Sequence, residues 1–178
     1  IPDRVTYIGD YAFKDCTSLK SVSISNSATT IGYYAFYGCS SLINIVIPDS
    51  VSFIGEAAFA NCTSLENISV SDNSEHYKAV DGVLFTKDGK TLITYPIKKE
   101  TSYNIPNGVT SIDALAFYNC TSLTSVTMPD SVTSIGTIAF YNCTSLKNVA
   151  IQDGVQTIGG GAFQSCKSLT EFAIPDSV

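Results

Sequence analysis

A short phrase, marked by a single cysteine, recurs along most of the chain with a period of 23 positions. Each cysteine has a phenylalanine three positions before it and a leucine three positions after it. A unit this short cannot enclose a hydrophobic core alone, but stacked copies cover one another's apolar edges. The period therefore predicts one solenoid domain over residues 1–178. The cysteines are Cys16, Cys39, Cys62, Cys120, Cys143 and Cys166, and their successive spacings are 23, 23, 58, 23 and 23.

Two local patterns recur inside each unit. The segment "LENISV" alternates at its end, so Ile68 and Val70 share one face, which predicts a short strand with one buried side. Strands repeated in this way should align as a parallel sheet, about 4.8 Å per turn of the coil. The stretch "IGEAAFANC" has an apolar spacing closer to that of a helix, which predicts a short helical turn.

The long interval between Cys62 and Cys120 breaks the period. Leu92, Tyr95 and Ile97 repeat the Leu and strand spacing, which predicts two long units (27 positions from Leu65 to Leu92, then 31 to Leu123) and seven units in all. Residues 71–104 are therefore expected to be irregular. Asp88-Gly89 stands between two apolar stretches, which predicts an inserted β-hairpin that projects from the middle of the solenoid. The alternative is a longer coil, because added loop length costs little free energy.

The phrase L-x-x-V-x-I-P-x-x-V-x-x-I-G-x-x-A-F-x-x-C-x-S-L resembles the BspA-like class of leucine-rich repeat. The stretch "YKAVDGVLFTKDGKTLITYP" (77–96) is similar to a variant unit of that family. The resemblance covers essentially the whole chain. It implies a right-handed curved coil with a parallel sheet on the concave face. It also implies surface or secreted proteins, some of which bind host matrix proteins or mediate adhesion.

The regular cysteines admit three interpretations: a metal site, a set of disulfides or a core column. Metal fingers need cysteine pairs two to four residues apart, and the chain has none. Equivalent residues on neighbouring turns lie within disulfide range. Because no unit carries more than one cysteine, and each lies between the Phe and Leu columns, we favour a reduced ladder of small buried side chains.

Composition excludes several classes of function. The net charge is −6 and the pI about 4.5, which argues against a nucleic-acid groove or docking on an anionic membrane. His76 is the only histidine and no Gly-rich phosphate loop or nucleophile elbow is present, so we expect neither an enzyme nor a cofactor or metal site. No apolar run is long enough to span a membrane, so we expect no membrane insertion of this fragment. Both ends fall at the same point of the phrase, "IPDRV" and "IPDSV", which predicts a fragment without its targeting signal.

Three groups of residues are candidates for partner binding. Tyrosine is favoured in interfaces because it joins a large apolar face to a polar tip, although these rings could also shield a corner of the coil. Small polar residues on the concave strands suit a protein or glycan more than a buried small ligand. The segment 71–104 holds five of the nine lysines, which could equally be ordinary solvated groups. The candidates are Tyr33, Tyr34, Tyr37, Tyr118, Tyr141, Ser21, Ser23, Asn44, Asn67, Ser69, Ser125, Thr127, Asn148, Lys87 and Lys90.

These features predict a non-catalytic repeat module of an extracellular or cell-surface protein. Its partner would be a protein, including host extracellular matrix in an adhesion-like role, or a glycan. The alternative is a structural spacer that positions another domain and has no partner of its own.

Overall fold

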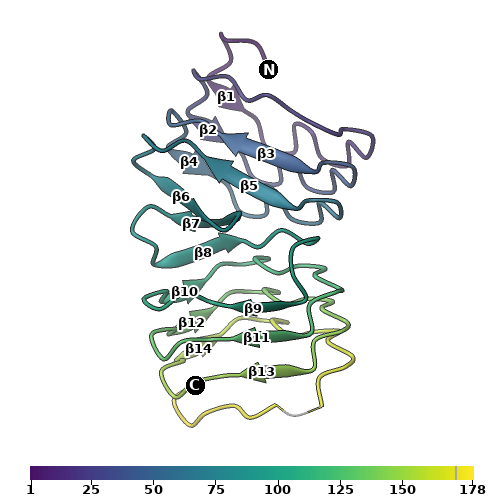
Figure 1. The fold of residues 1–178 in the computed structure, drawn as a ribbon, viewed down its shortest axis with the longest axis vertical. Helices are drawn as coiled ribbons and strands as arrows, with labels where there is room; N and C mark the ends of the chain where they lie inside the picture. The colour runs from purple at the N-terminus through teal and green to yellow at the C-terminus, as the bar shows by residue number, and fades with distance from the viewer. Residues whose placement is uncertain (171) are drawn as a thin grey trace.

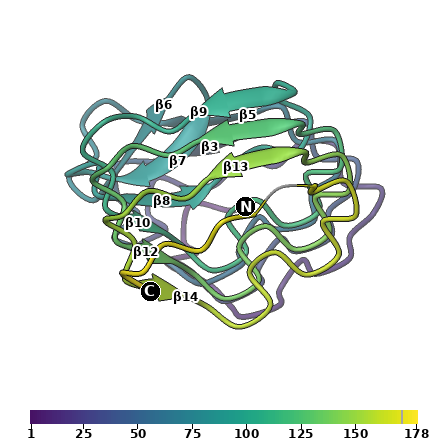
Figure 2. The same ribbon diagram turned by 90° about the horizontal axis from the view of Figure 1, so that it is seen from below.

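The computed structural model describes residues 1–170 and 172–178, which form a coil of about seven turns. Short strands occupy two columns that run along the coil on adjacent sides (Figures 1 and 2). The predicted solenoid with parallel strands is confirmed. The division into one domain with an irregular segment over 71–104 stays a prediction.

The first column holds the Ile-Gly segment of each unit, and the second holds the segment after the leucine. Each column is split into two sheets. The first sheet of the first column has the strand order β1 (Tyr7–Ile8), β2 (Thr30–Ile31) and β4 (Phe53–Ile54). The second sheet of this column has the order β14 (Thr157–Ile158), β12 (Ser134–Ile135), β10 (Ser111–Ile112), β8 (Thr91–Thr94), β7 (Val83–Thr86) and β6 (Tyr77–Val80). In the second column, β3 (Asn44–Ile47) pairs with β5 (Asn67–Val70), and β11 (Ser125–Thr127) lies between β13 (Asn148–Ala150) and β9 (Ser102–Asn104).

Equivalent residues of successive units pair across neighbouring turns, as the period requires. Ile45 is the partner of Ile68, and Ser125 of Asn148. Along β3 exposed and buried residues alternate, with Ile45 and Ile47 inside. The apolar columns therefore stack on the inside, each residue over its equivalent.

The corner that contains the phenylalanine is not helical. Among the described residues no helix is present, and the corner is a run of tight turns with a left-handed residue near each end, as at Tyr11 (φ 60°) and Asp15 (φ 57°). This backbone directs successive N–H groups in different directions: Ala12 N–H donates to the carbonyl of Gly9 (3.2 Å), whereas Phe13 N–H donates to Ala35 on the next turn (2.7 Å). The prediction of a helical turn was wrong because hydrogen bonds between turns replace the bonds that a helix makes within itself.

The corner aromatics form a stack inside the coil. Phe36 lies between Phe13 (ring centroids 5.1 Å apart) and Phe59 (5.7 Å), with nearly parallel planes. A second run joins Tyr95, Phe117, Phe140 and Phe163 at 5.0, 4.6 and 5.1 Å. Tyr95 therefore holds the aromatic position of the irregular turn.

We call residues 71–104 the seam, and its register differs from the prediction. Leu92 pairs with Ile112, which places it in the Ile-Gly column and not in the Leu column. Phe85 lies beside Leu92 in the sheet, and Tyr95 takes the corner position expected for a phenylalanine. The number of turns was right, but the boundary between the two long units was set by the wrong residue, because one leucine and one isoleucine are interchangeable in a pattern of apolar spacing.

The inserted hairpin is confirmed, and a second hairpin precedes it. β7 and β8 are antiparallel about Asp88-Gly89, while β6 and β7 are joined at Asp81-Gly82, where both residues have positive φ (48° and 76°), as a two-residue type I′ turn requires. Neither hairpin projects: Val83 and Leu84 in β7 are fully buried. The predicted projection was wrong because the hairpins extend the first strand column.

The core is divided at the seam. One buried cluster runs from Ile8 to Leu84 and the other from Val83 to Ala162. Neighbouring residues of β7 therefore face different clusters, as strand alternation dictates. At the same level no Cα atom of β5 lies within 8 Å of one in β9, so the second strand column is interrupted.

Candidate partner-binding surfaces

Tyrosine rings form a continuous row along the outer corner of the coil. Tyr11 stacks on Tyr34 (centroids 5.3 Å), Tyr34 contacts Tyr37 (5.6 Å), Tyr37 contacts Tyr118 (6.2 Å), and Tyr118 stacks on Tyr141 (5.1 Å). We call these five residues the tyrosine row. Four of the predicted tyrosines are thus brought into one feature, which Tyr11 extends at the N-terminal end.

The contact between Tyr37 and Tyr118 joins the two halves of the row across the seam. It exists because the irregular turn has no full corner, so the corners on either side of it are neighbours. The side chain of Asn119 donates directly to that of Asn61 (2.7 Å), and Asn142 donates to Asn119 (2.7 Å). Sequence spacing could not show this neighbourhood, because residues 61 and 119 are separated by 58 positions.

The row also has charge and hydroxyl groups at its surface. The Lys14 ammonium lies 5.6 Å from the ring centroids of both Tyr11 and Tyr37. Burial, followed by the hydrogen bond with Tyr118, raises the pKa of Tyr37, so its hydroxyl stays neutral and can donate or accept. Sequence reasoning missed Tyr11 and Lys14, although they hold the columns of Tyr34 and Tyr37 in the preceding unit.

Tyr33 does not join the row. It is 46% exposed and meets Phe53 edge-on at 5.8 Å, while its N–H donates to the Asp10 carboxylate (2.9 Å). With Tyr7 (56% exposed) it belongs to an aromatic patch beside β1, β2 and β4.

The small polar residues of the second strand column lie at the surface, but they do not form one continuous face. Ser21, Ser23, Asn44, Thr127 and Asn148 are exposed, and Asn67, Ser69 and Ser125 are half-buried. The interruption between β5 and β9 contains a polar cavity of about 490 Å³, with Asn67 on one side and Ser102 and Asn104 on the other. The predicted surface is therefore two patches with a gap at the seam.

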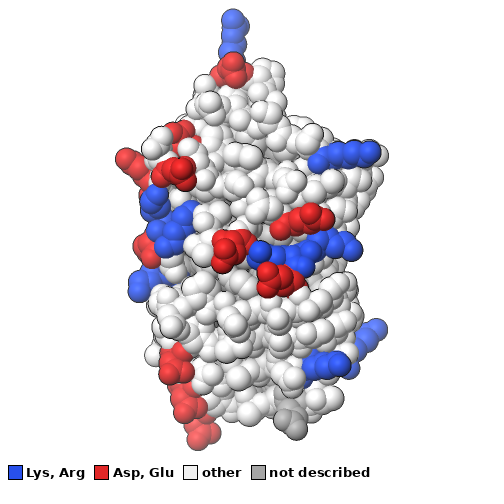
Figure 3. All heavy atoms as spheres, viewed as in Figure 1, with Lys and Arg blue, Asp and Glu red and all other residues white. Residues whose placement is uncertain are grey.

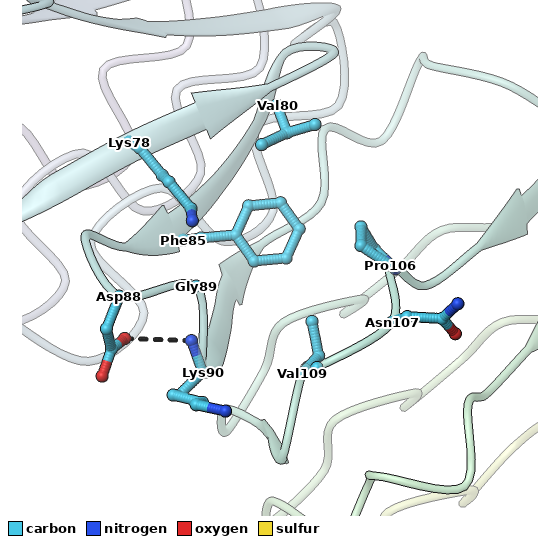
Figure 4. A pocket seen from close by; sticks show the side chains of 10 residues that line it. Lys78, Val80, Phe85, Asp88, Gly89, Lys90, Pro106, Asn107 and Val109 are labelled. Atoms are coloured by element: carbon cyan, nitrogen blue, oxygen red, sulfur yellow. Dashed lines mark hydrogen bonds between the residues drawn. The ribbon is translucent and has the colours of Figure 1, made fainter.

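Lys87 and Lys90 are exposed at the turn between β7 and β8. Lysine side chains, with carboxylates among them, lie at mid-height along the left edge of the molecule in Figure 3. Beside them lies a small pocket of about 150 Å³ with Lys78 and Lys90 at its rim and Phe85 and Val109 in its wall (Figure 4). Sequence reasoning did not identify the pocket; Asn107-Gly108, in place of the usual Asp-Ser, was the available signal.

The cysteine column serves the structure. The Cys62 thiol donates to the carbonyl of Phe36, and Cys143 to that of Phe117, each at 3.1 Å, with both cysteines fully buried. Burial raises the pKa of the Cys120 thiol. These thiols are thus held in the protonated form, which is a poor nucleophile and metal ligand.

Among residues 1–170 and 172–178, no group of three His, Cys, Asp or Glu side chains is placed to hold a metal ion. The same residues contain no helix with the length and hydropathy of a membrane span. What the described surfaces offer is a row of aromatic rings, polar strand edges and a local cluster of lysines. Such features are suited to contact with another molecule.

The fold and the repeating phrase define a leucine-rich repeat solenoid. The BspA type leucine rich repeat region matches residues 1–85 and 94–178 in six copies, and the chain belongs to this family. Comparison with curated protein sequences finds no match.

Solved structures with the same fold come from several bacteria. A leucine rich cell surface protein from Faecalibacterium prausnitzii A2-165 is 40% identical (TM-score 0.92), with all of this chain and 47% of the other covered. The pneumococcal vaccine antigen PcpA is 31% identical (TM-score 0.94; 100% and 45% covered). A leucine-rich repeat protein from Eubacterium ventriosum ATCC 27560 is 31% identical (TM-score 0.77; 94% and 51% covered). The chain therefore spans about half the length of the proteins it resembles.

Proposed function

We propose that this chain is a non-catalytic module of a cell-surface protein and that it binds a protein partner through the tyrosine row. The membership of a surface repeat family supports the location. The continuous row, and in particular the Tyr37–Tyr118 contact that unites its halves, is the observation that carries the proposal. Partner binding in an adhesion-like role on host matrix is the form of this function that the resemblance favours.

The physical argument rests on what partly exposed, mutually packed tyrosines offer. Each ring presents a large apolar area with few rotatable bonds, so little side-chain entropy is lost on binding. Stacking within the row restricts the rings further before a partner arrives. Such pre-organised aromatic residues are typical of the few positions that carry most of an interface's binding energy.

The unit that contains Cys62 shows which substitutions in the tyrosine row should leave the fold intact. Ala57 occupies the same column as Tyr34, with the same left-handed backbone (φ 58° and 55°), and Ala60 occupies the column of Tyr118. The double variant Tyr34→Ala/Tyr118→Ala therefore copies side chains that the coil already accommodates. Tyr7→Ala removes an exposed tyrosine outside the row and is the matched control.

The test measures binding of the purified chain to immobilised extracellular-matrix proteins and to a glycan array. We expect saturable binding to at least one matrix protein, weakened about tenfold or more by the double variant and unchanged by Tyr7→Ala. Binding to glycans but to no matrix protein would show that the partner is a glycan and not a protein. Absence of any binding, or equal binding by all three proteins, would support a spacer that only positions another domain.

A further inference from the structure

The pocket at the seam lies between the two hairpins and the turn Pro106–Val109. Its wall is apolar, formed by Val80, Phe85, Pro106 and Val109, and Figure 4 shows the Phe85 ring facing the Val109 side of the turn. Its volume of about 150 Å³ is well below the 300 Å³ or more typical of sites for whole small ligands. The pocket can therefore take one side chain or one functional group of a larger molecule.

The turn Pro106–Val109 lacks the serine that this turn has in several other units. In three other units this turn reads Pro-Asp-Ser-Val (48–51, 129–132 and 175–178), and the serine hydroxyl donates to a carbonyl of the preceding turn, as Ser50 does to Ala28 (2.8 Å) and Ser131 to Val109 (2.7 Å). In the turn that follows the seam Gly108 replaces the serine, as Gly154 does in a later unit, but a Cβ at Gly154 would meet the Asp130 carbonyl oxygen at 2.5 Å. Gly108 has φ 91°, and no atom lies within 4 Å of the position that its Cβ would occupy. The space that a side chain and a neighbouring turn fill elsewhere is left free.

Two lysines stand at the rim, Lys78 beside the Phe85 ring and Lys90 on a hydrogen-bonded backbone. Lys78 is opposite Phe85 in the antiparallel pair β6–β7, so its aliphatic stem shares a face with that ring. Its ammonium lies over Gly89, where a Cβ would come within 2.5 Å of Nζ, so a side chain at position 89 would displace the ammonium. The Lys90 backbone is held by Asp88 and by Thr110, whose N–H donates to the Lys90 carbonyl (2.8 Å).

The one carboxylate of the pocket forms no ion pair with these lysines. One oxygen of Asp88 accepts from the Thr86 hydroxyl (2.6 Å) and from the Lys90 N–H (2.9 Å). These two hydrogen bonds, in that order, lower the pKa of Asp88, and the nearby lysines add a smaller effect. Within the described part of the chain, the ammonium nitrogen of neither Lys78 nor Lys90 lies within 4.0 Å of a carboxylate oxygen. The rim therefore presents two available ammonium groups above an apolar wall.

We propose that this pocket receives the carboxylate of an acidic side chain, with glutamate as the best fit, from a protein partner. The carboxylate lies between the Lys78 and Lys90 ammonium groups, and the methylenes contact Val80 and Pro106. The assignment rests on the proposed function, since it gives the chemistry of a second contact made by the same partner. Its location on the seam places it outside the tyrosine row.

A sulfated polysaccharide fits the pocket less well. Polyanions are held by many cations that displace counterions along the chain, and only Lys78, Lys87 and Lys90 gather here on a body of net charge −6. The volume suits a single charged group, and the apolar wall matches methylenes. A glutamate side chain supplies both.

The experiment is a titration of the ¹⁵N-labelled chain with acetyl-Ala-Glu-Ala-amide at constant ionic strength, followed through the backbone amide signals of Gly89, Lys90, Gly108 and Val109. The matched peptide acetyl-Ala-Gln-Ala-amide differs only in the charge. We expect saturable shifts at these amides in the millimolar range for the Glu peptide and at least fivefold weaker binding for the Gln peptide. Lys78→Gln should weaken the Glu peptide at least fivefold, whereas Lys147→Gln, an exposed lysine on another turn, should leave it unchanged.

Three results would overturn the proposal. Equal binding of both peptides would show that charge is not recognised, and equal loss with Lys147→Gln would show a general charge effect. Sodium sulfate that saturates the same amides more tightly than the Glu peptide would assign the pocket to a sulfated sugar. Because the titration needs neither the natural partner nor the tyrosine row, its failure is distinguishable from failure of the proposed function.

Discussion

The aromatic stack makes a quantitative prediction about the variants Phe36→Ala and Phe13→Ala. Phe36 is fully buried between two parallel rings, whereas Phe13 is half-buried and has one ring neighbour in its stack. Truncating a buried phenylalanine costs about 3–5 kcal/mol, through lost transfer free energy and the cavity left behind. Phe36→Ala also loses two ring contacts, each contributing about 0.5–1.5 kcal/mol, so its effect should lie at the upper end of that range. Phe13→Ala should cost roughly half as much, in proportion to its burial.

The assay is urea unfolding followed by far-UV circular dichroism, combined with hydrogen exchange to assign the loss to a part of the coil. Both residues belong to the N-terminal half, so the same amides should report both variants. Phe36→Leu keeps most of the volume and removes only the ring, so it should cost less than Phe36→Ala and measure the stacking contribution. Small and equal effects at positions 36 and 13 would refute the idea that each turn is stabilised by both of its neighbours.

Three further predictions concern single groups. Tyr77→Phe removes the hydroxyl that accepts from the Ile54 N–H (2.9 Å), so the free energy of unfolding should fall by about 1–3 kcal/mol and the Ile54 amide should exchange faster. Burial is the largest cause that raises the pKa of Asp113, so the folded protein holds a proton more tightly there than the unfolded chain does, and stability is lost as the pH rises from 3.8 through the raised pKa. Asp113→Asn should therefore be more stable than the native chain at pH 7 but not below pH 3.8, as measured by urea unfolding across this range. Iodoacetamide should modify the exposed Cys16 before the buried Cys120, whose pKa burial raises; peptide mass spectrometry gives the order, and an early reaction at Cys120 would contradict the packing.

The regular units could be predicted from the sequence because each column repeats one kind of side chain at one spacing. Phe13 and Phe36 stack, and Ile45 lies beside Ile68, as the repeat period requires. The corner was misjudged because apolar spacing alone does not distinguish a helical turn from successive tight turns bonded to the next level of the coil. A left-handed backbone, as at Ile138 (φ 48°), is unfavourable for a β-branched residue, so residue preferences did not indicate this conformation.

The candidate surfaces, too, could be predicted only in part from the sequence. The columns placed Tyr34, Tyr37, Tyr118 and Tyr141 at the corner, but the contact that unites them depends on which turns are neighbours across the seam. That neighbourhood follows from an incomplete corner, in which Tyr95 fills the aromatic position but no residue separates Asn61 from Asn119. The pocket likewise arises from absent atoms, at Gly108 and Gly89, and not from a recognisable motif.

The seam is the place where the coil should open first, because both strand columns and the core are interrupted at this level. β6 does not pair with β4; instead the Tyr77 hydroxyl accepts a hydrogen bond from the Ile54 N–H. Beside the gap in the second column, the Lys98 N–H donates to the carbonyl of Leu65 (2.9 Å). These isolated bonds replace the continuous ladders found elsewhere, so the coil should open at the seam before either half unfolds. Amide exchange at Ile68, whose N–H donates to Gly82 at this interruption (3.0 Å), should therefore be faster than exchange at Ile31, which lies inside the N-terminal sheet.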